Sequence, residues 1–135
     1  MTLTDTGPLI ALIDEDDNYY HACTAALPRL PRPLITTWPC ITEAAHLLGR
    51  SLGHRAQDKL LGWIENGLVT IHEQSPAEIA RMRVLMDKYS DRPMDLPDAS
   101  MVAAAETLGV RRIFTVDSDF RFYVLANGRT LEMVP

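Results

Sequence analysis

A short apolar run that leads into two carboxylates limits the fold of this chain more than any other segment. Residues 112–116 (Arg-Ile-Phe-Thr-Val) are rich in β-branched and aromatic side chains, and Asp117 and Asp119 follow directly. Such a run, with Gly109 before it and turn-forming residues after it, predicts a strand buried on both faces. Parallel sheets bind ligands at the carboxyl ends of their strands. The segment therefore predicts a functional edge or, alternatively, an Asx turn that only closes the strand.

Short strands and helices alternate along the rest of the chain. Further strands are predicted to end at Asp5 and to span residues 34–37, 68–71 and 130–134. Helices are predicted from Pro8, over residues 18–27, 40–48 and 56–65, from Pro76 onward, and over residues 94–109. This alternation predicts an α/β fold, with a central parallel sheet of four to five strands between two helical layers. With 135 residues, we expect 1–135 to form a single domain.

Carboxylates are predicted to gather at one edge of that sheet. Asp5 ends the first strand, and Asp117 and Asp119 end the fourth. Glu43 and Asp98 occupy the first turns of two predicted helices, which places them near the same edge if those helices begin there. Five carboxylates are therefore expected to converge.

Converging carboxylates predict a metal site. Ionised carboxylates share a small site only when protons or cations offset their repulsion. The ligands are oxygens alone, without cysteine or histidine at matched spacing, and such a set favours Mg²⁺ or Mn²⁺ over Zn²⁺. These ions catalyse displacement at phosphorus, so the pattern predicts a phosphodiesterase or nuclease.

The overall charge is consistent with that prediction. A net charge of −5 argues against a broad basic surface that grips a nucleic-acid backbone. However, removing the five converging acids from the 18 acidic residues leaves 13, which equals the number of basic residues. Outside the predicted site the chain is therefore neutral, and arginines remain available to contact phosphates.

Other features place the chain in a reducing compartment. Cys23 and Cys40 are isolated, which predicts buried reduced thiols and a cytoplasmic protein. No basic-then-apolar leader and no apolar run near the roughly 18 residues of a membrane span are present, so we expect neither export nor insertion. Trp38, Trp63 and the methionines are assigned to the core or to a dimer interface, rather than to RNA stacking.

Four segments, taken in order, resemble one known family. The chain resembles the PIN domains, and most closely the VapC-type ribonuclease toxins of toxin–antitoxin pairs, over essentially its whole length. The segments that carry the resemblance are Asp5-Thr6-Gly7-Pro8-Leu9-Ile10-Ala11-Leu12, Thr42-Glu43-Ala44, Met94-Asp95-Leu96-Pro97-Asp98-Ala99-Ser100 and Thr115-Val116-Asp117-Ser118-Asp119-Phe120.

The resemblance implies a PIN-like α/β/α sandwich and a metal-dependent endoribonuclease. In the family the acids hold one or two Mg²⁺ or Mn²⁺ ions, water attacks the phosphodiester, and a 3′-hydroxyl leaves. It also implies an RNA substrate, a small antitoxin protein as partner, and a homodimer. The implied catalytic acids and metal ligands are Asp5, Glu43, Asp98 and Asp117, with Asp119 as an auxiliary metal ligand.

Two positions depart from the family pattern or leave it ambiguous. Gly7 stands where many relatives carry a serine, which removes a hydroxyl beside the first acid but spares all four acids. Asp95 competes with Asp98, because either can cap the helix that follows.

Three alternative classes were compared with the nuclease. A phosphoaspartate receiver domain requires a lysine near the end of a late strand, and no lysine follows Lys88. A haloacid-dehalogenase phosphatase requires D-x-D at the first strand, whereas this chain has Asp5-Thr6-Gly7. A catalytically inactive PIN-like module that binds RNA or protein remains open as the non-enzyme alternative.

Overall fold

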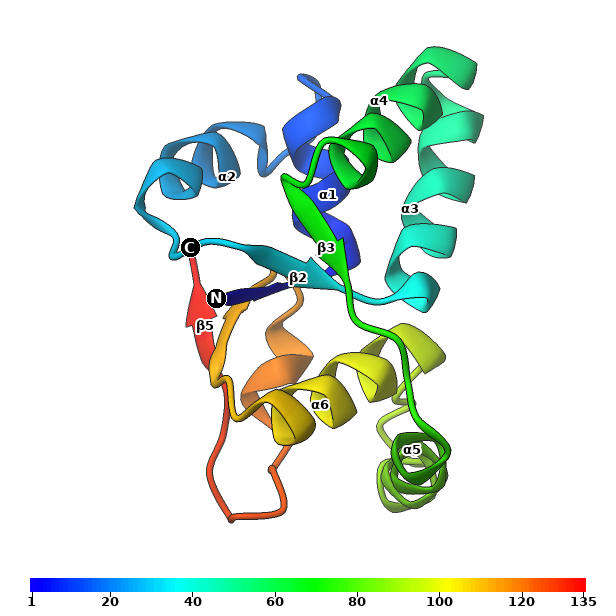
Figure 1. Cartoon of the computed structure of the whole chain (residues 1–135), viewed down its shortest axis with the longest axis vertical. Helices are drawn as coiled ribbons and strands as arrows, with labels where there is room; N and C mark the ends of the chain where they lie inside the picture. The colour runs from blue at the N-terminus through cyan, green and yellow to red at the C-terminus, as the bar shows by residue number, and fades with distance from the viewer.

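Five parallel strands form one sheet at the centre of the computed structural model, which describes residues 1–135 (Figure 1). Their order across the sheet is β3-β2-β1-β4-β5, so β1 lies in the middle. The predicted parallel sheet is therefore confirmed. The strands are β1 (Thr2–Thr4), β2 (Leu34–Thr36), β3 (Val69–Ile71), β4 (Arg112–Phe114) and β5 (Glu132–Val134).

Helices cover both faces of this sheet. Figure 1 shows α1 to α4 on one side and α5 and α6 on the other, which confirms the three-layer α/β/α sandwich. The helices are α1 (Thr6–Ile13), α2 (Tyr20–Ala26), α3 (Trp38–Ser51), α4 (His54–Glu65), α5 (Pro76–Lys88) and α6 (Leu96–Leu108). Two short 3₁₀ turns, η1 (Leu27–Arg29) and η2 (Ser118–Arg121), complete the set. None of the helices is both long and apolar enough to cross a lipid bilayer.

The sheet separates two hydrophobic cores. Successive side chains of a strand point to opposite faces, so Ile113 joins the core under α5 and α6 while Phe114 joins the core under α1 to α4. The first of these cores includes the small side chains of α6, from Ala99 to Ala105. The alanines among them allow α6 to approach the sheet closely. This close packing sets the position of the first turn of α6 relative to the edge of the sheet.

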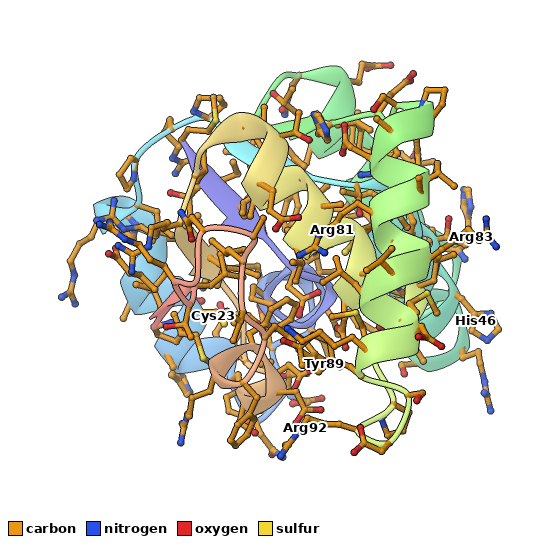
Figure 2. All side chains as sticks on the ribbon, turned by 90° about the horizontal axis from the view of Figure 1, so that it is seen from below. Cys23, His46, Arg81, Arg83, Tyr89 and Arg92 are labelled. Carbon is orange, nitrogen blue, oxygen red and sulfur yellow. The ribbon has the colours of Figure 1, made fainter.

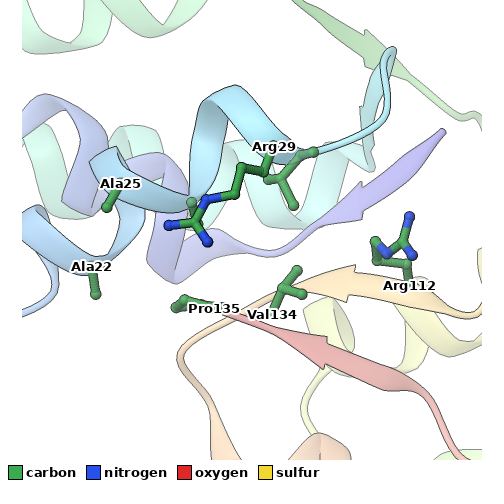
Figure 3. Close-up of a pocket in the computed structure, with 8 residues that line it drawn as sticks. Ala22, Ala25, Arg29, Arg112, Val134 and Pro135 are labelled. Atoms are coloured by element: carbon green, nitrogen blue, oxygen red, sulfur yellow. The ribbon is translucent and has the colours of Figure 1, made fainter.

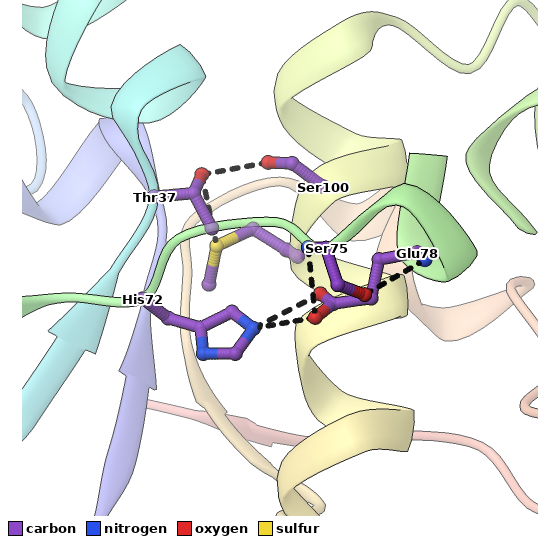
Figure 4. A network of polar contacts seen from close by, with 6 residues as sticks. Thr37, His72, Ser75, Glu78 and Ser100 are labelled. Carbon is purple, nitrogen blue, oxygen red and sulfur yellow. Dashed lines mark hydrogen bonds and ion pairs between the residues drawn. The ribbon is translucent and has the colours of Figure 1, made fainter. Parts of the chain in front are cut away.

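Local signals define the ends of α5 and α6. Ser75 accepts a hydrogen bond from the Glu78 backbone N–H, and the Glu78 carboxylate accepts one from the Ser75 N–H, so the predicted capping box is confirmed. The same carboxylate bonds to His72 Nε2 at 2.9 Å, which ties the β3–α5 connection together (Figure 4). Gly109 ends α6 in the left-handed conformation, at φ +67°.

Some predicted boundaries are wrong by a few residues. The strand predicted over 112–116 ends at Phe114. The helix predicted over 40–48 begins at Trp38, because Pro39 is suited to a first turn and does not delay the start. Of the two locations predicted for the tryptophans, core or dimer interface, Trp63 packs against the core, whereas Trp38 is 47% exposed and lies outside it.

Candidate metal centre

The register between β1 and β4 brings the first two acids together. Leu3 pairs with Ile113 and Thr4 with Phe114, and the Asp5 N–H then donates to the Phe114 carbonyl at 2.9 Å. Asp5 therefore emerges from the sheet beside the segment that carries Asp117. This edge lies where the chain order across the sheet reverses, the position at which open α/β sheets bind ligands.

The third acid comes from the start of α6. Asp95 is the N-cap of this helix, and its carboxylate accepts a hydrogen bond from the Asp98 N–H at 2.9 Å. Asp98 then lies in the first turn, and 95% of its surface is covered. The competition between the two aspartates is resolved by this geometry, because Asp95 caps the helix and Asp98 faces the sheet edge.

Asp5, Asp98 and Asp117 form a compact acidic group. One carboxylate oxygen from each lies within 4.8 Å of the others. Three carboxylate oxygens this close together are a donor set that a hard divalent cation such as Mg²⁺ or Mn²⁺ can bind. We call these three residues the aspartate cluster.

Burial and repulsion raise the proton affinity of the aspartate cluster. Burial is the main reason that the pKa of Asp5 rises to about 6, and the charge of Asp117 adds to this rise. Burial, followed by the charges of Asp95, Asp5 and Asp117, raises the pKa of Asp98 to about 8. The pKa of Asp117 is also raised, again mainly by burial. Without a cation, the aspartate cluster is therefore partly protonated near neutral pH.

Two neighbouring groups orient Asp5. The Thr115 hydroxyl donates to Asp5 Oδ2 at 2.9 Å and accepts from the Asp117 N–H at 3.0 Å, so one side chain positions both acids. The Cys40 thiol lies 3.7 Å from Asp5 Oδ1, and burial raises the pKa of Cys40 to about 12. Cys40 is thus a neutral, weak donor beside the site. The prediction of a buried reduced thiol is confirmed, but its contact with Asp5 was not predicted.

Tyr123 was missed by the sequence analysis. Its hydroxyl donates to Asp98 Oδ2 at 2.8 Å, and its ring is fully buried against Phe120 and Tyr89. Burial, then the bond to Asp98, raises the pKa of Tyr123 far above its usual value. Tyr123 follows Asp119 by four residues, so its proximity to the acidic segment could be expected from the sequence. Nothing in the sequence indicates which carboxylate its hydroxyl meets.

Glu43 lies beside the aspartate cluster but outside it. Its Oε2 accepts a hydrogen bond from the Thr6 hydroxyl at 3.0 Å, and Thr6 follows Asp5 directly in the chain. Glu43 sits in the second turn of α3 and is half-buried. The structure thus links it to the first acid through one side chain, and its role as a ligand stays a prediction.

Asp119 also lies outside the aspartate cluster. Its backbone N–H donates to Asp117 Oδ1 at 2.9 Å, so the Asx turn that was considered for this segment is present. The turn and the acidic site are compatible, because the second carboxylate oxygen of Asp117 is still available as a cation ligand. The auxiliary role of the Asp119 carboxylate stays a prediction.

Another cavity does not share the chemistry of these acids. About 480 Å³ in volume, it lies between α2, β4 and β5 and is lined by alanines, Val134, Pro135 and two arginines (Figure 3). None of the predicted site residues lines it. The residues able to hold a cation are therefore those at the carboxyl edge of the sheet.

A parallel sheet between two helical layers, with acids at the carboxyl edge of the sheet, defines the class of the protein. The model of the PIN domain family matches residues 2–124, and the chain belongs to the PIN domain family. The predicted resemblance to this family is confirmed.

The chain is also similar to individual proteins that carry VapC names. The chain is 24% identical to Ribonuclease VapC26 of Mycobacterium tuberculosis over 115 residues, which cover 85% of each protein. Its fold matches the crystal structure of VapC20, a sarcin-ricin loop cleaving toxin from the same organism, with a TM-score of 0.87, 21% identity and complete coverage of both chains. It also matches VapBC2 of Rickettsia felis, bound to a DNA fragment from its promoter, with a TM-score of 0.68 and 12% identity over 99% of this chain and 98% of that one.

Proposed function

We propose that this protein is a metal-dependent endoribonuclease of the VapC type, the toxin of a toxin–antitoxin pair, in which residues 1–135 act as one PIN domain. The single observation that carries the proposal is the aspartate cluster at the carboxyl edge of the sheet. Membership in the PIN family and similarity to proteins named as ribonuclease toxins support it.

The residues of the site fit a hard divalent cation. The donors are carboxylate oxygens, and the burial and mutual repulsion that raise the pKa values of Asp5 and Asp98 support a site that a cation would stabilise. We propose Asp5, Asp98 and Asp117 as direct ligands of Mg²⁺ or Mn²⁺, and Glu43 and Asp119 as further acids that complete the site. Such a cation, when bound, supplies a nucleophilic water and neutralises charge on the phosphate.

The chain's own residues organise this reaction. Thr115 holds Asp5 and the Asp117 backbone, and Tyr123 holds Asp98, so the ligands are oriented before substrate arrives. Water then adds to phosphorus, the bond from phosphorus to O3′ breaks, and the leaving O3′ takes a proton. The products carry a 5′-phosphate and a 3′-hydroxyl.

The proposed partners follow from the same relatives. Similar folds occur in a toxin–antitoxin complex from Klebsiella pneumoniae, at 19% identity over 87% of this chain, and in VapBC2. We therefore propose an antitoxin protein as partner, RNA as substrate, and a homodimer as the free form.

Cleavage assays on defined variants test the proposal. Purified protein is incubated with single-stranded RNA in Mn²⁺ or Mg²⁺, and in EDTA. We expect EDTA to stop cleavage and Asp98→Asn to reduce its rate by more than about a hundredfold, because a direct ligand matters at least as much as the groups that support it. Asp58→Asn on α4, an exposed acid remote from the edge, is the matched control and should retain activity.

The inactive-module alternative predicts a different result. It requires RNA or partner binding without turnover at any metal concentration. Cleavage that survives both EDTA and Asp98→Asn would disprove the metal mechanism instead.

A further inference from the structure

An open groove adjoins the candidate metal centre on the α3 side. It is about 560 Å³ in volume and lies between the first turns of α3 and α6, which start close together (Figure 1). Glu43 lines it, so the groove continues directly from the acids proposed to act on phosphate. The other residues important here are Trp38, His46, Asp95, Leu96 and Pro97.

The walls of the groove are apolar and exposed. Trp38 from α3 is 47% exposed and Leu96 from α6 is 51% exposed, and both line the same groove as one apolar surface. Pro97 extends the apolar wall along α6. A contiguous apolar surface of this kind marks a site where a partner or a ligand binds.

The two walls are held rigidly with respect to each other. Thr37, the residue before α3, shares a hydrogen bond of 2.6 Å with Ser100 of α6 (Figure 4). Both hydroxyls are fully buried. The start of α3 is therefore fastened to α6 at the base of the groove, and the groove is a preformed feature.

The polar rim suits a nucleobase better than a phosphate. No lysine or arginine lines the groove, whereas the carboxylates of Glu43 and Asp95 do. One oxygen of Asp95 is used to cap α6, which leaves the other free to accept a hydrogen bond. Carboxylates accept from the exocyclic amino groups of bases and repel phosphate. His46, exposed on α3, also lines the groove and can donate or accept a hydrogen bond (Figure 2).

We propose that this groove binds an unpaired base of the RNA substrate, next to the scissile phosphate, by stacking on Trp38. The inference rests on the proposed ribonuclease function, because continuity with the metal centre is what places RNA here. Aromatic side chains that stack unpaired bases are a general means of holding single-stranded RNA. The carboxylate rim further favours a base with an exocyclic amino group (adenine, cytosine or guanine) over uracil.

Tryptophan fluorescence provides a test that does not depend on cleavage. The chain has two tryptophans, so Trp63→Phe leaves Trp38 as the only reporter. In a Trp63→Phe/Asp98→Asn background, short single-stranded RNA of random sequence should quench this fluorescence. An abasic ribose-phosphate oligomer of equal length should quench it much less, because it offers no base to stack.

Affinity measurements complete the test. Trp38→Ala should weaken RNA binding by between about fivefold and a hundredfold, as base–aromatic stacking typically does, while Trp38→Phe should restore most of it. Tyr19→Ala is the matched control, since Tyr19 is an equally exposed aromatic residue on the distant start of α2, and it should bind RNA normally.

The possible outcomes separate this inference from the proposed function. Quenching by RNA, with no metal-dependent cleavage by the wild type, would support the groove and disprove the nuclease. Cleavage without quenching, and with unchanged affinity in Trp38→Ala, would overturn the groove alone. If Trp38→Ala changes only the sedimentation of the protein, the face is a contact between copies of the chain, and the inference is wrong.

Discussion

Tyr123 and Thr115 each orient a different acid of the aspartate cluster. Each donates one hydroxyl, Tyr123 to Asp98 and Thr115 to Asp5, and each lies at a buried position. Groups that orient metal ligands in this way typically contribute 10- to 100-fold to metal affinity. The two hydroxyls therefore matter to the site although neither is a ligand.

Replacing Tyr123 by phenylalanine isolates this effect. The change removes the hydroxyl from Asp98 Oδ2 and preserves the buried ring, so we expect Mn²⁺ affinity to fall by about tenfold. Isothermal titration calorimetry with Mn²⁺ measures it.

Tyr89→Phe is the matched control for that experiment. Its ring packs against Tyr123 at 5.1 Å, but its hydroxyl accepts from the Val124 N–H and touches no acid. We expect this variant to lose stability and to keep its metal affinity. Equal losses of Mn²⁺ affinity in both variants would show that aromatic packing, not the bond to Asp98, is responsible.

At the scale of elements, the packing of α1 against the end of β4 accounts for Gly7. A Cβ added at Gly7 would collide with Cγ2 of Val116, whereas Gly62 in α4 has open space around it. The chain therefore lacks the serine common at this position for a packing reason. The adjacent Thr6 still supplies a hydroxyl to Glu43.

A pair of glycine substitutions tests that explanation. We expect Gly7→Ala to lower the free energy of unfolding by about 1–3 kcal/mol, because it overpacks the contact with Val116. Gly62→Ala should raise it by about 0.5–1 kcal/mol, since alanine is the better helix former. Urea unfolding measures both. The explanation requires that Val116→Ala recover much of the loss in the Gly7→Ala background, and a failure to recover would contradict it.

At the scale of the whole molecule, the aspartate cluster links stability to pH. The pKa values of Asp5 and Asp98 are raised in the folded protein, to about 6 and about 8, from a model value of 3.8. The folded state therefore holds protons that the unfolded chain releases. The contribution of these two groups to the free energy of unfolding is therefore largest below about pH 4. It is lost as the pH rises through their folded pKa values.

Thermal unfolding should display this dependence. In EDTA, we expect the Tm to fall by several degrees between pH 5 and pH 8, with Asp5 alone accounting for about 1.4 kcal/mol of the change in stability over this range. Excess Mn²⁺ should reduce or reverse the fall, because a cation that binds only the folded state replaces the lost protons. Asp98→Asn should flatten the curve measured in EDTA. A Tm that is independent of pH in EDTA would contradict the linkage.

Much of this molecule follows from local sequence. The capping box at Ser75 and Glu78 and the helix end at Gly109 are local patterns, and both are present as predicted. Short apolar strand segments alternate with helical segments along the chain, and this alternation predicts the parallel sheet. Both patterns can be recognised locally, because the side-chain periods of strands and helices are set by backbone geometry. The strand end at Phe114 was missed because Thr115 and Val116 are β-branched, and propensity alone extends the strand through both of them.

The sequence by itself determined the order of the elements, the family, and the set of acids from which a metal site is built. Only the tertiary structure decided which of those acids meet. Asp5 and Asp117 come together through the register of β1 on β4, and Asp98 through the close approach of α6, whereas Glu43 and Asp119 lie just outside. It also decided that Tyr123 reaches Asp98 and that Trp38 is exposed. The physical reason is that register and helix position are set by packing across the whole core, between residues far apart in the chain.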